Sequence, residues 1–218
     1  MILNAFYISF KVVVVSVIIS LIVTLIAINI LIEKKVKGKN LIETIMIFPM
    51  FLPPSAVGYL VLIALGRRGF LGSILYENFN ISIIFTWFAA VIVGVIVSLP
   101  VMYQSIKTSI LSIDEDIKNA AREMGASEFQ VFRKISLPLC RKGILTGLIL
   151  SIARVFGEFG ATILVAGNIP GETQTVPMAM YYAIENNDVL ASKTILIIIV
   201  IISIVLTCLY NKILKRIV

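Results

Sequence analysis

The stretch Asn119-Ala-Ala-Arg-Glu-Met-Gly125, with Ile135-Ser-Leu-Pro138 ten residues further on, lies in a polar segment that covers residues 112–138. The sequence on either side of this segment is very apolar. An ordered polar loop of this length is uncommon unless it has a function of its own. We therefore interpret the segment as a surface that another protein contacts, carried by a membrane-embedded body.

Two capping patterns predict how this segment folds. Ser112-x-x-Glu115 and Ser127-x-x-Gln130 are typical of capping boxes, which satisfy the free N–H groups at the start of a helix. Gly125 favours a left-handed residue that ends the first helix. We expect a second helix to begin after Ser127, to run through about Lys134 and to end at Leu137-Pro138. The segment is therefore predicted to form two short helices with a sharp turn between them.

The first of these helices has a narrow apolar stripe, formed by Ile117, Ala120, Ala121 and Met124 at helical spacing. Alanines on the stripe would let another surface approach closely, and polar neighbours such as Arg122 and Glu123 could form contacts around it. The alternative from periodicity alone is a surface loop that only connects two membrane spans.

Composition places the chain among membrane proteins. Of its 218 residues, 59% are hydrophobic and 14% are charged, against roughly 45–50% and about 25% in soluble domains. The apolar residues form five runs long enough to cross a bilayer as helices, near residues 8–32, 43–65, 82–106, 143–166 and 189–211. We expect an all-α, polytopic membrane helix bundle in a single domain, residues 1–218. Pro53-Pro54 should kink the second span.

The residue inventory excludes several kinds of chemistry. The chain has no His and only two Cys, which excludes Ser-His-Asp and Cys-His catalysis and offers no disulfide framework or metal cluster. No phosphate-binding loop or dinucleotide fingerprint is present. We therefore expect no catalytic residue, no metal and no cofactor bound by this chain. If nucleotide energy drives it, another chain binds the nucleotide.

The distribution of basic residues predicts the orientation in the membrane. Most of the 19 Lys and Arg residues fall in loops 33–42 and 107–142 and in the C-terminal tail, and basic loops face the cytoplasm. The N-terminus is then outside and the C-terminus inside, and the net charge of +7 reflects topology, not nucleic-acid binding. The basic residues concerned are Lys34, Lys35, Lys37, Lys39, Lys107, Lys118, Arg122, Arg133, Lys134, Arg141, Lys142, Lys212, Lys215 and Arg216.

The fourth span carries polar side chains at helical spacing, which are Ser151, Arg154, Glu158 and Thr162. On an unbroken helix they form one stripe. A charged side chain at mid-bilayer costs about 2.5–3.5 kcal/mol, so the stripe should face the bundle interior or water, with Arg154 and Glu158 paired. It is either part of a translocation path or an internal ion pair that holds helices together.

Arg67 and Arg68 lie on the predicted outer side, against the charge bias of the other loops. They could attract an anion that arrives from outside. The alternative is contact with lipid head groups or with acidic residues of a docked partner.

The polar loop resembles the signature of permease subunits of binding-protein-dependent ABC transporters. That signature reads Glu-Ala-Ala, three residues, Gly, nine residues, Ile-x-Leu-Pro; here Asn119 stands where Glu is usual. The resemblance implies the type I importer permease fold, with this loop docked in a cleft of a separate ATPase subunit. Carried over residue by residue, the docking residues are Asn119, Ala120, Ala121, Glu123, Met124, Gly125 and Ala126.

Further motifs resemble the molybdate/tungstate permease subfamily, over residues 45–190. They are Pro53-Pro-Ser-Ala-Val-Gly-Tyr59, Gly66-Arg-Arg-Gly-Phe-Leu-Gly72, Ala153-Arg-Val-Phe-Gly-Glu-Phe-Gly-Ala-Thr162 and Gly167-Asn-Ile-Pro-Gly-Glu-Thr-Gln-Thr175. Sulfate permeases share the Arg-Arg-Gly and Gly-Glu-Phe-Gly elements. The resemblance implies a tetrahedral dianion as cargo, an extracytoplasmic oxyanion-binding protein that delivers it, a second permease copy, and two ATPase subunits that bind ATP-Mg.

The expected function is therefore a non-catalytic permease subunit that imports molybdate across the cell membrane, with tungstate or sulfate as alternative cargo. A different class, an anion channel or ion-coupled carrier, would not need the two capped helices. A membrane-embedded enzyme would need an acid–base pair, and Glu158 alone is insufficient.

Overall fold

The computed structural model describes residues 2–33 and 38–215, and every regular element in these ranges is helical. Of the basic residues that predict the orientation, Lys34, Lys35, Lys37 and Arg216 lie outside the described residues. Three helices of the described part are long and apolar enough to cross a membrane, or up to five spans if each bent helix pair is counted as one. The predicted all-α membrane bundle is confirmed.

Helices α1 (Ile2–Ile28) and α5 (Trp87–Leu111) form the central pair of the bundle. Serine side chains of α1 lie against α5, and their hydroxyl groups form hydrogen bonds with groups of α5. Ser16 Oγ donates to the carbonyl of Val91 at 3.1 Å, and the hydroxyls of Ser20 and Ser98 are 2.6 Å apart. At its C-terminal end α1 continues as a π-helical turn, η1 (Asn29–Glu33).

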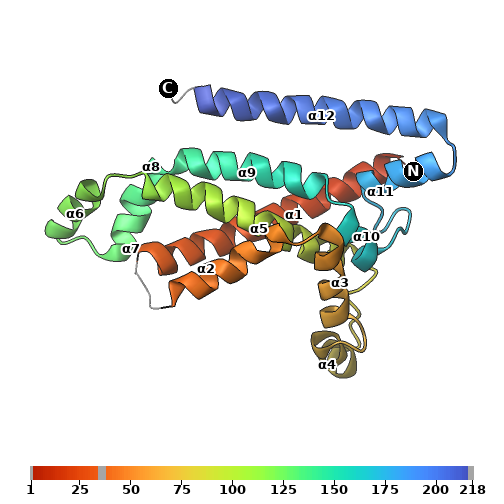
Figure 1. The fold of residues 1–218 in the computed structure, drawn as a ribbon, viewed down its shortest axis with the longest axis horizontal. Coiled ribbons are helices and arrows are strands. Elements are labelled where there is room, and N and C mark those ends of the chain that lie inside the picture. The colour runs from red at the N-terminus through yellow and green to blue at the C-terminus, as the bar shows by residue number, and fades with distance from the viewer. Residues whose placement is uncertain (1, 34–37, 216–218) are drawn as a thin grey trace.

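The second span is broken at Pro53-Pro54, as predicted. It consists of α2 (Lys39–Ile47), the 3-10 turn η2 (Phe48–Phe51) and α3 (Pro54–Leu65), with a bend of 117° at the break. Proline cannot donate the backbone hydrogen bond that would continue the helix. After the break α3 leads to α4 (Phe70–Phe79), and the two helices project from the bundle as an arm (Figure 1).

The fourth span, predicted as one helix over residues 143–166, is two helices in the structure. Helix α9 (Arg141–Phe156) ends before Gly157, and α10 (Gly160–Ala166) begins after Phe159. Glu158 lies in the break, and its carboxylate accepts the N–H of Ala161 at 2.9 Å. This bond satisfies one of the free N–H groups in the first turn of α10.

The polar segment forms a pair of short helices at the end of the bundle opposite the N-terminus (Figure 1). They are α6 (Glu115–Glu123) and α7 (Glu128–Val131). The second does not stop at Leu137-Pro138. It continues through the π-helical turn η3 (Phe132–Ser136) into α8 (Leu137–Leu139), where Pro138 occupies the first turn, a position that needs no N–H donor.

The last two helices of the described residues are the short α11 (Val176–Glu185) and the long α12 (Val189–Lys215). A turn precedes α11, in which the N–H groups of Glu172, Thr173 and Gln174 all donate to the carbonyl of Ile169. Helix α12 runs alongside the bundle with little of its surface buried.

Candidate functional site

A side chain caps the start of helix α6 and a glycine ends it, but the residue that caps the start is not the predicted one. Asp114, not Ser112, caps its start, accepting the N–H of Asp116 at 3.0 Å. Ser112 instead ends α5 and bonds back to Ser109. The left-handed Gly125 is confirmed, with φ of +86°. The N–H of Gly125 bonds to Arg122 and that of Ala126 to Ala121, which completes a Schellman motif.

The helix α7 begins with the predicted capping box. Ser127 Oγ accepts the N–H of Gln130, and the Gln130 side chain accepts the N–H of Ser127. Arg122 joins the two helices, because its guanidinium donates to both oxygens of Glu128 and also to Glu115. These hydrogen bonds raise the pKa of Arg122 above its already high ordinary value, so the side chain stays charged at every working pH.

Most of the predicted docking residues face solvent. Asn119, Ala120, Glu123, Met124 and Gly125 are exposed, and Met124 is 82% exposed. Ala126 is half-buried, whereas Ala121 is buried beneath the loop, at 5% exposure. We call Ile117, Ala120, Met124 and Phe129, the exposed apolar side chains of α6 and α7, the loop face. Phe129 was missed by sequence reasoning because a four-residue helix shows no periodicity.

The polar residues of the fourth span are brought together only in part. Arg154 and Glu158 form an ion pair across the break between α9 and α10. Ser151 is fully buried and donates to Ser98 of α5 at 3.4 Å, and Thr162 is buried on α10. Because the helix breaks at 157–159, the four side chains do not share one face as expected. Arg154 alone, with 37% of its side chain exposed, reaches the surface.

A close contact between α3 and α10 holds the second half of this break. A Cβ on Gly58 would lie 2.7 Å from the Cα and carbonyl oxygen of Ala161, so only glycine allows the two backbones to approach this far. The broken second span and the broken fourth span therefore meet next to Glu158. Sequence reasoning missed this contact, since nothing local marks which helix a glycine will face.

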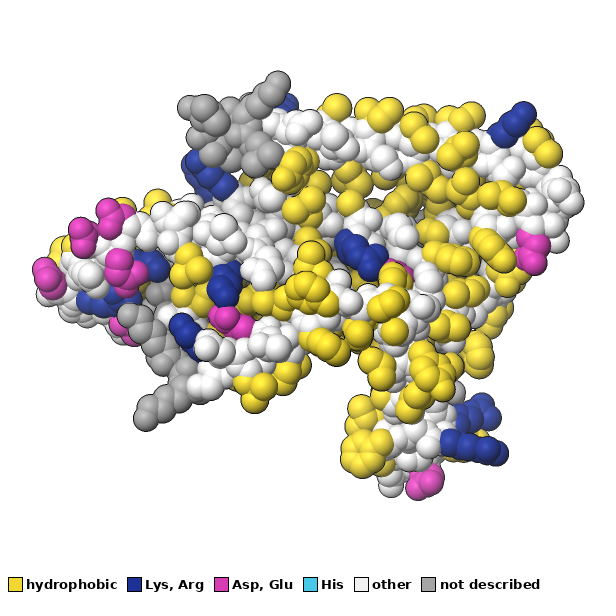
Figure 2. Space-filling view, in the orientation of Figure 1, with side chains coloured by type: hydrophobic (Ala, Val, Ile, Leu, Met, Phe, Trp, Pro, Cys, Tyr) yellow, Lys and Arg dark blue, Asp and Glu magenta, His cyan; other side chains and the backbone are white. Residues whose placement is uncertain are grey.

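The arginines Arg67 and Arg68 lie in the turn between α3 and α4, at the base of α4. Both are exposed, and Arg67 lies 4.9 Å from the ring of Tyr76, which keeps it on the arm. Figure 2 shows charged side chains on this arm and over the α6–α7 end, while the surface between them is a mixture of hydrophobic and uncoloured atoms with a few charged side chains.

These features define a class of protein: a multi-pass membrane protein whose broken spans meet at an ion pair and whose polar loop presents two capped helices. A family model described as "Binding-protein-dependent transport system inner membrane component" matches residues 16–218. The chain belongs to this family of inner membrane transport components.

Two relatives carry the same name, molybdenum transport system permease protein ModB. The protein of Haemophilus influenzae is 42% identical over 183 residues, 84% of this chain and 80% of ModB. That of Escherichia coli K12 is 45% identical over 148 residues, 68% of this chain and 65% of ModB. The sulfate transport system permease protein CysW of Synechococcus elongatus is more distant, at 33% identity over 74% of this chain and 56% of CysW.

Solved structures show the same fold. A bacterial ABC transporter that imports the acidic polysaccharide alginate superposes with a TM-score of 0.76 at 16% identity, over 99% of this chain and 79% of that chain. A second structure of the alginate transporter, in complex with its periplasmic protein, superposes with a TM-score of 0.74 over 99% of this chain and 78% of that chain.

Proposed function

We propose that this protein is the membrane permease of an ATP-driven molybdate importer. The identity with two molybdenum permeases carries the proposal, because it exceeds that with the sulfate permease CysW and extends over most of the chain. Tungstate, also a tetrahedral dianion, is the alternative cargo, and sulfate is the next.

The proposed orientation places the N-terminus outside and the C-terminus and the α6–α7 pair in the cytoplasm. In this orientation the loop face docks on an ATPase subunit that binds ATP-Mg. The two caps, the Schellman motif and the Arg122 bridge support this role, because they fix the relative position of α6 and α7. Force applied to the loop face is then passed to α5 and α9, between which the loop is inserted.

The translocation path is proposed to run past Arg154, at the break in the fourth span. Arg154 is held by Glu158 through one nitrogen and is partly exposed. It can offer its other N–H groups to a passing oxyanion. A single cation already paired with a carboxylate binds an anion weakly, which suits passage more than retention. The oxyanion-binding protein on the outer side then supplies the selectivity.

In a lone copy, 37% of the Arg154 side chain is exposed. A charge in that position is costly unless protein or water covers it. This supports a homodimer in which a second copy covers Arg154, with two ATPase subunits below. Arg67 and Arg68, exposed on the α3–α4 arm, are proposed to attract the arriving anion or to contact its carrier.

Reconstituted uptake tests the function. The permease, its ATPase and its binding protein are placed in vesicles, and entry of labelled molybdate is followed with and without ATP. We expect uptake that requires ATP and the binding protein, with tungstate competing more strongly than sulfate. Uptake that proceeds without ATP would indicate a channel or an ion-coupled carrier. Competition by sulfate as strong as that by molybdate would reassign the cargo.

A further inference from the structure

Helix α12 is fastened to the protein near its first turns. Ile195 is 1% exposed and packs in a cluster with Ala5 of α1 and with Val176 and Ala179 of α11. Beyond this cluster the helix stands away from the bundle, and only 6% of its membrane-spanning window is buried. Figure 1 shows α12 as a separate rod beside α9 and α1.

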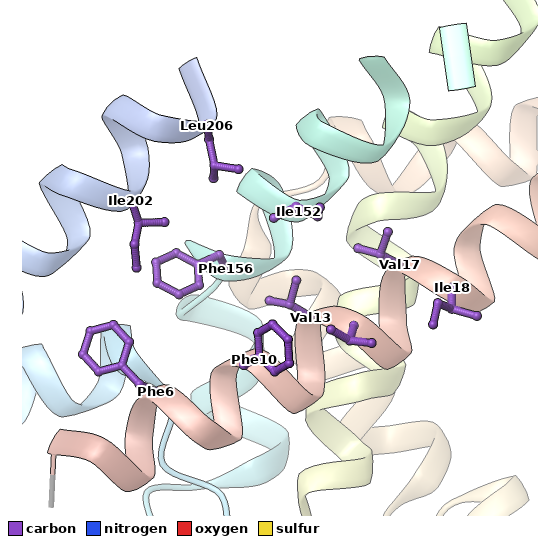
Figure 3. Close-up of a pocket in the computed structure, with 10 residues that line it drawn as sticks. Phe6, Phe10, Val13, Val17, Ile18, Ile152, Phe156, Ile202 and Leu206 are labelled. Carbon is purple, nitrogen blue, oxygen red and sulfur yellow. The ribbon is translucent and has the colours of Figure 1, made fainter. Parts of the chain in front are cut away.

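A groove of about 490 Å³ separates α12 from α1 and α9. Figure 3 shows the rings of Phe6, Phe10 and Phe156 in the space between α1 and α12, with Ile202 and Leu206 on the opposite wall. The remaining lining side chains of α1 and α9 are aliphatic, so every side chain in the groove is hydrocarbon. Such a groove offers nothing to an ion or to water, which needs polar partners.

The groove is open to the surroundings of the protein, since Phe10 is 69% exposed and Ile18 is 51% exposed. At this position on three membrane-spanning helices the surrounding medium is the hydrocarbon of the bilayer. An empty apolar gap loses the dispersion contacts that its lining atoms could make. Hydrocarbon that enters the groove restores them.

The length of the groove matches one leaflet. From Phe6 to Ile18 the groove follows α1 for twelve residues, about 18 Å at a rise of about 1.5 Å per residue. Half of a hydrocarbon core of about 30 Å is about 15 Å. The groove starts near the N-terminal end of α1, so it lies at the depth of the outer leaflet in the proposed orientation.

We propose that this groove is a binding site for one acyl chain of an outer-leaflet phospholipid. The chain fills the space that side chains leave between α12 and the bundle, and thereby packs α12 against α1. It also contacts Phe156, the last residue of α9, which directly precedes the break and lies between Arg154 and Glu158 in the chain. The bilayer thus contributes to the packing of an element next to the proposed path.

A phospholipid with a photoactivatable diazirine in its acyl chain tests the site. The full-length protein is reconstituted in nanodiscs that contain this lipid, irradiated and mapped by mass spectrometry. We expect labels on the groove side of α1 and α12. Ile202→Trp should lower this labelling severalfold by filling the groove. Ile204→Trp, two residues away on the same helix and not part of the groove lining, should leave it unchanged.

Two variants guard against other outcomes. If Ile202→Trp does not assemble, Val14→Phe narrows the groove from the α1 side and should lower the labelling in the same way. Equal labelling in the groove-filling and control variants would overturn the proposal.

A disulfide between cysteines at Phe10 and Leu206 of one copy would mean that α12 closes onto α1. Cysteines at Ile18 and Ile202 that join between copies would mean that a second copy fills the groove. Either cross-linking result would overturn the proposal that a lipid chain fills the groove.

Discussion

At the residue scale, the Glu158 carboxylate makes two different contacts. One of its carboxylate oxygens pairs with the guanidinium of Arg154, and the other accepts the N–H of Ala161. The residue is 4% exposed, so both contacts are made away from water. The same side chain therefore neutralises a membrane-embedded cation and satisfies an N–H group in the first turn of α10.

The double role of Glu158 predicts a graded response to substitution. Glu158→Ala leaves Arg154 and the N–H of Ala161 without their partner, which should lower stability by about 1–3 kcal/mol. Glu158→Gln keeps one acceptor oxygen, which can serve one of the two donors, and should cost less. The midpoint of thermal unfolding in detergent measures the difference. If Glu158→Ala unfolds at the same temperature as the wild type, the carboxylate does not hold the break.

At the scale of helices, the two broken spans are positioned by their mutual contact. Helix α3 follows the proline break and α10 follows the break at residues 157–159, and they meet where Gly58 lies against Ala161. Gly157, in the break itself, has room for a side chain, since an added Cβ would meet only the carbonyl of Ala153 at 3.5 Å. The two glycines therefore provide a test position, Gly58, and a control position, Gly157, for the same substitution by alanine.

Gly58→Ala should therefore push α3 away from α10 and cost about 1–3 kcal/mol, as is usual for overpacking. ATP-driven uptake should fall with it, because α10 shares the break with Arg154. Gly157→Ala is the control and should retain most of the stability and uptake. Equal behaviour of the two variants, in unfolding and in transport assays, would show that the α3–α10 contact is not critical.

The helix-level features that the sequence predicted correctly are those with a local cause. The kink at Pro53-Pro54, the capping box at Ser127 and the left-handed Gly125 each follow from the chemistry of a few neighbouring residues. The cap at Ser112 was wrong because Asp114, two residues later, is an equally good cap. Local chemistry cannot choose between two such candidates.

The features that sequence reasoning missed depend on tertiary contacts. Hydropathy averages over a window, so the fourth span read as one helix although it is broken at residues 157–159. The polar stripe was predicted from that unbroken helix. In the structure, Ser151 faces α5 and Arg154 reaches the surface, so the stripe is not continuous. The contact of Gly58 with Ala161 joins residues far apart in the chain, and no pattern in either segment indicates it.

At the scale of the whole molecule, exposed charge is concentrated on the α6–α7 pair and also occurs on the projecting arm. The α6–α7 pair is polar and rigidly capped, and the arm carries Arg67 and Arg68 (Figure 2). Between them the surface suits lipid or a second copy. This arrangement is what a transporter needs if it is driven from one side and loaded from the other.

The central claim is that the loop face docks on a separate ATPase, and site-directed cross-linking tests it most directly. In a Cys208→Ser background, Met124→Cys on the loop face is compared with Phe79→Cys on the arm, since both native side chains are largely exposed. We expect Met124→Cys to cross-link to the ATPase subunit in membranes, with a yield that changes when ATP is added, and Phe79→Cys to give no such product. Absence of an ATPase adduct from Met124→Cys, or an equal yield from Phe79→Cys, would contradict the account.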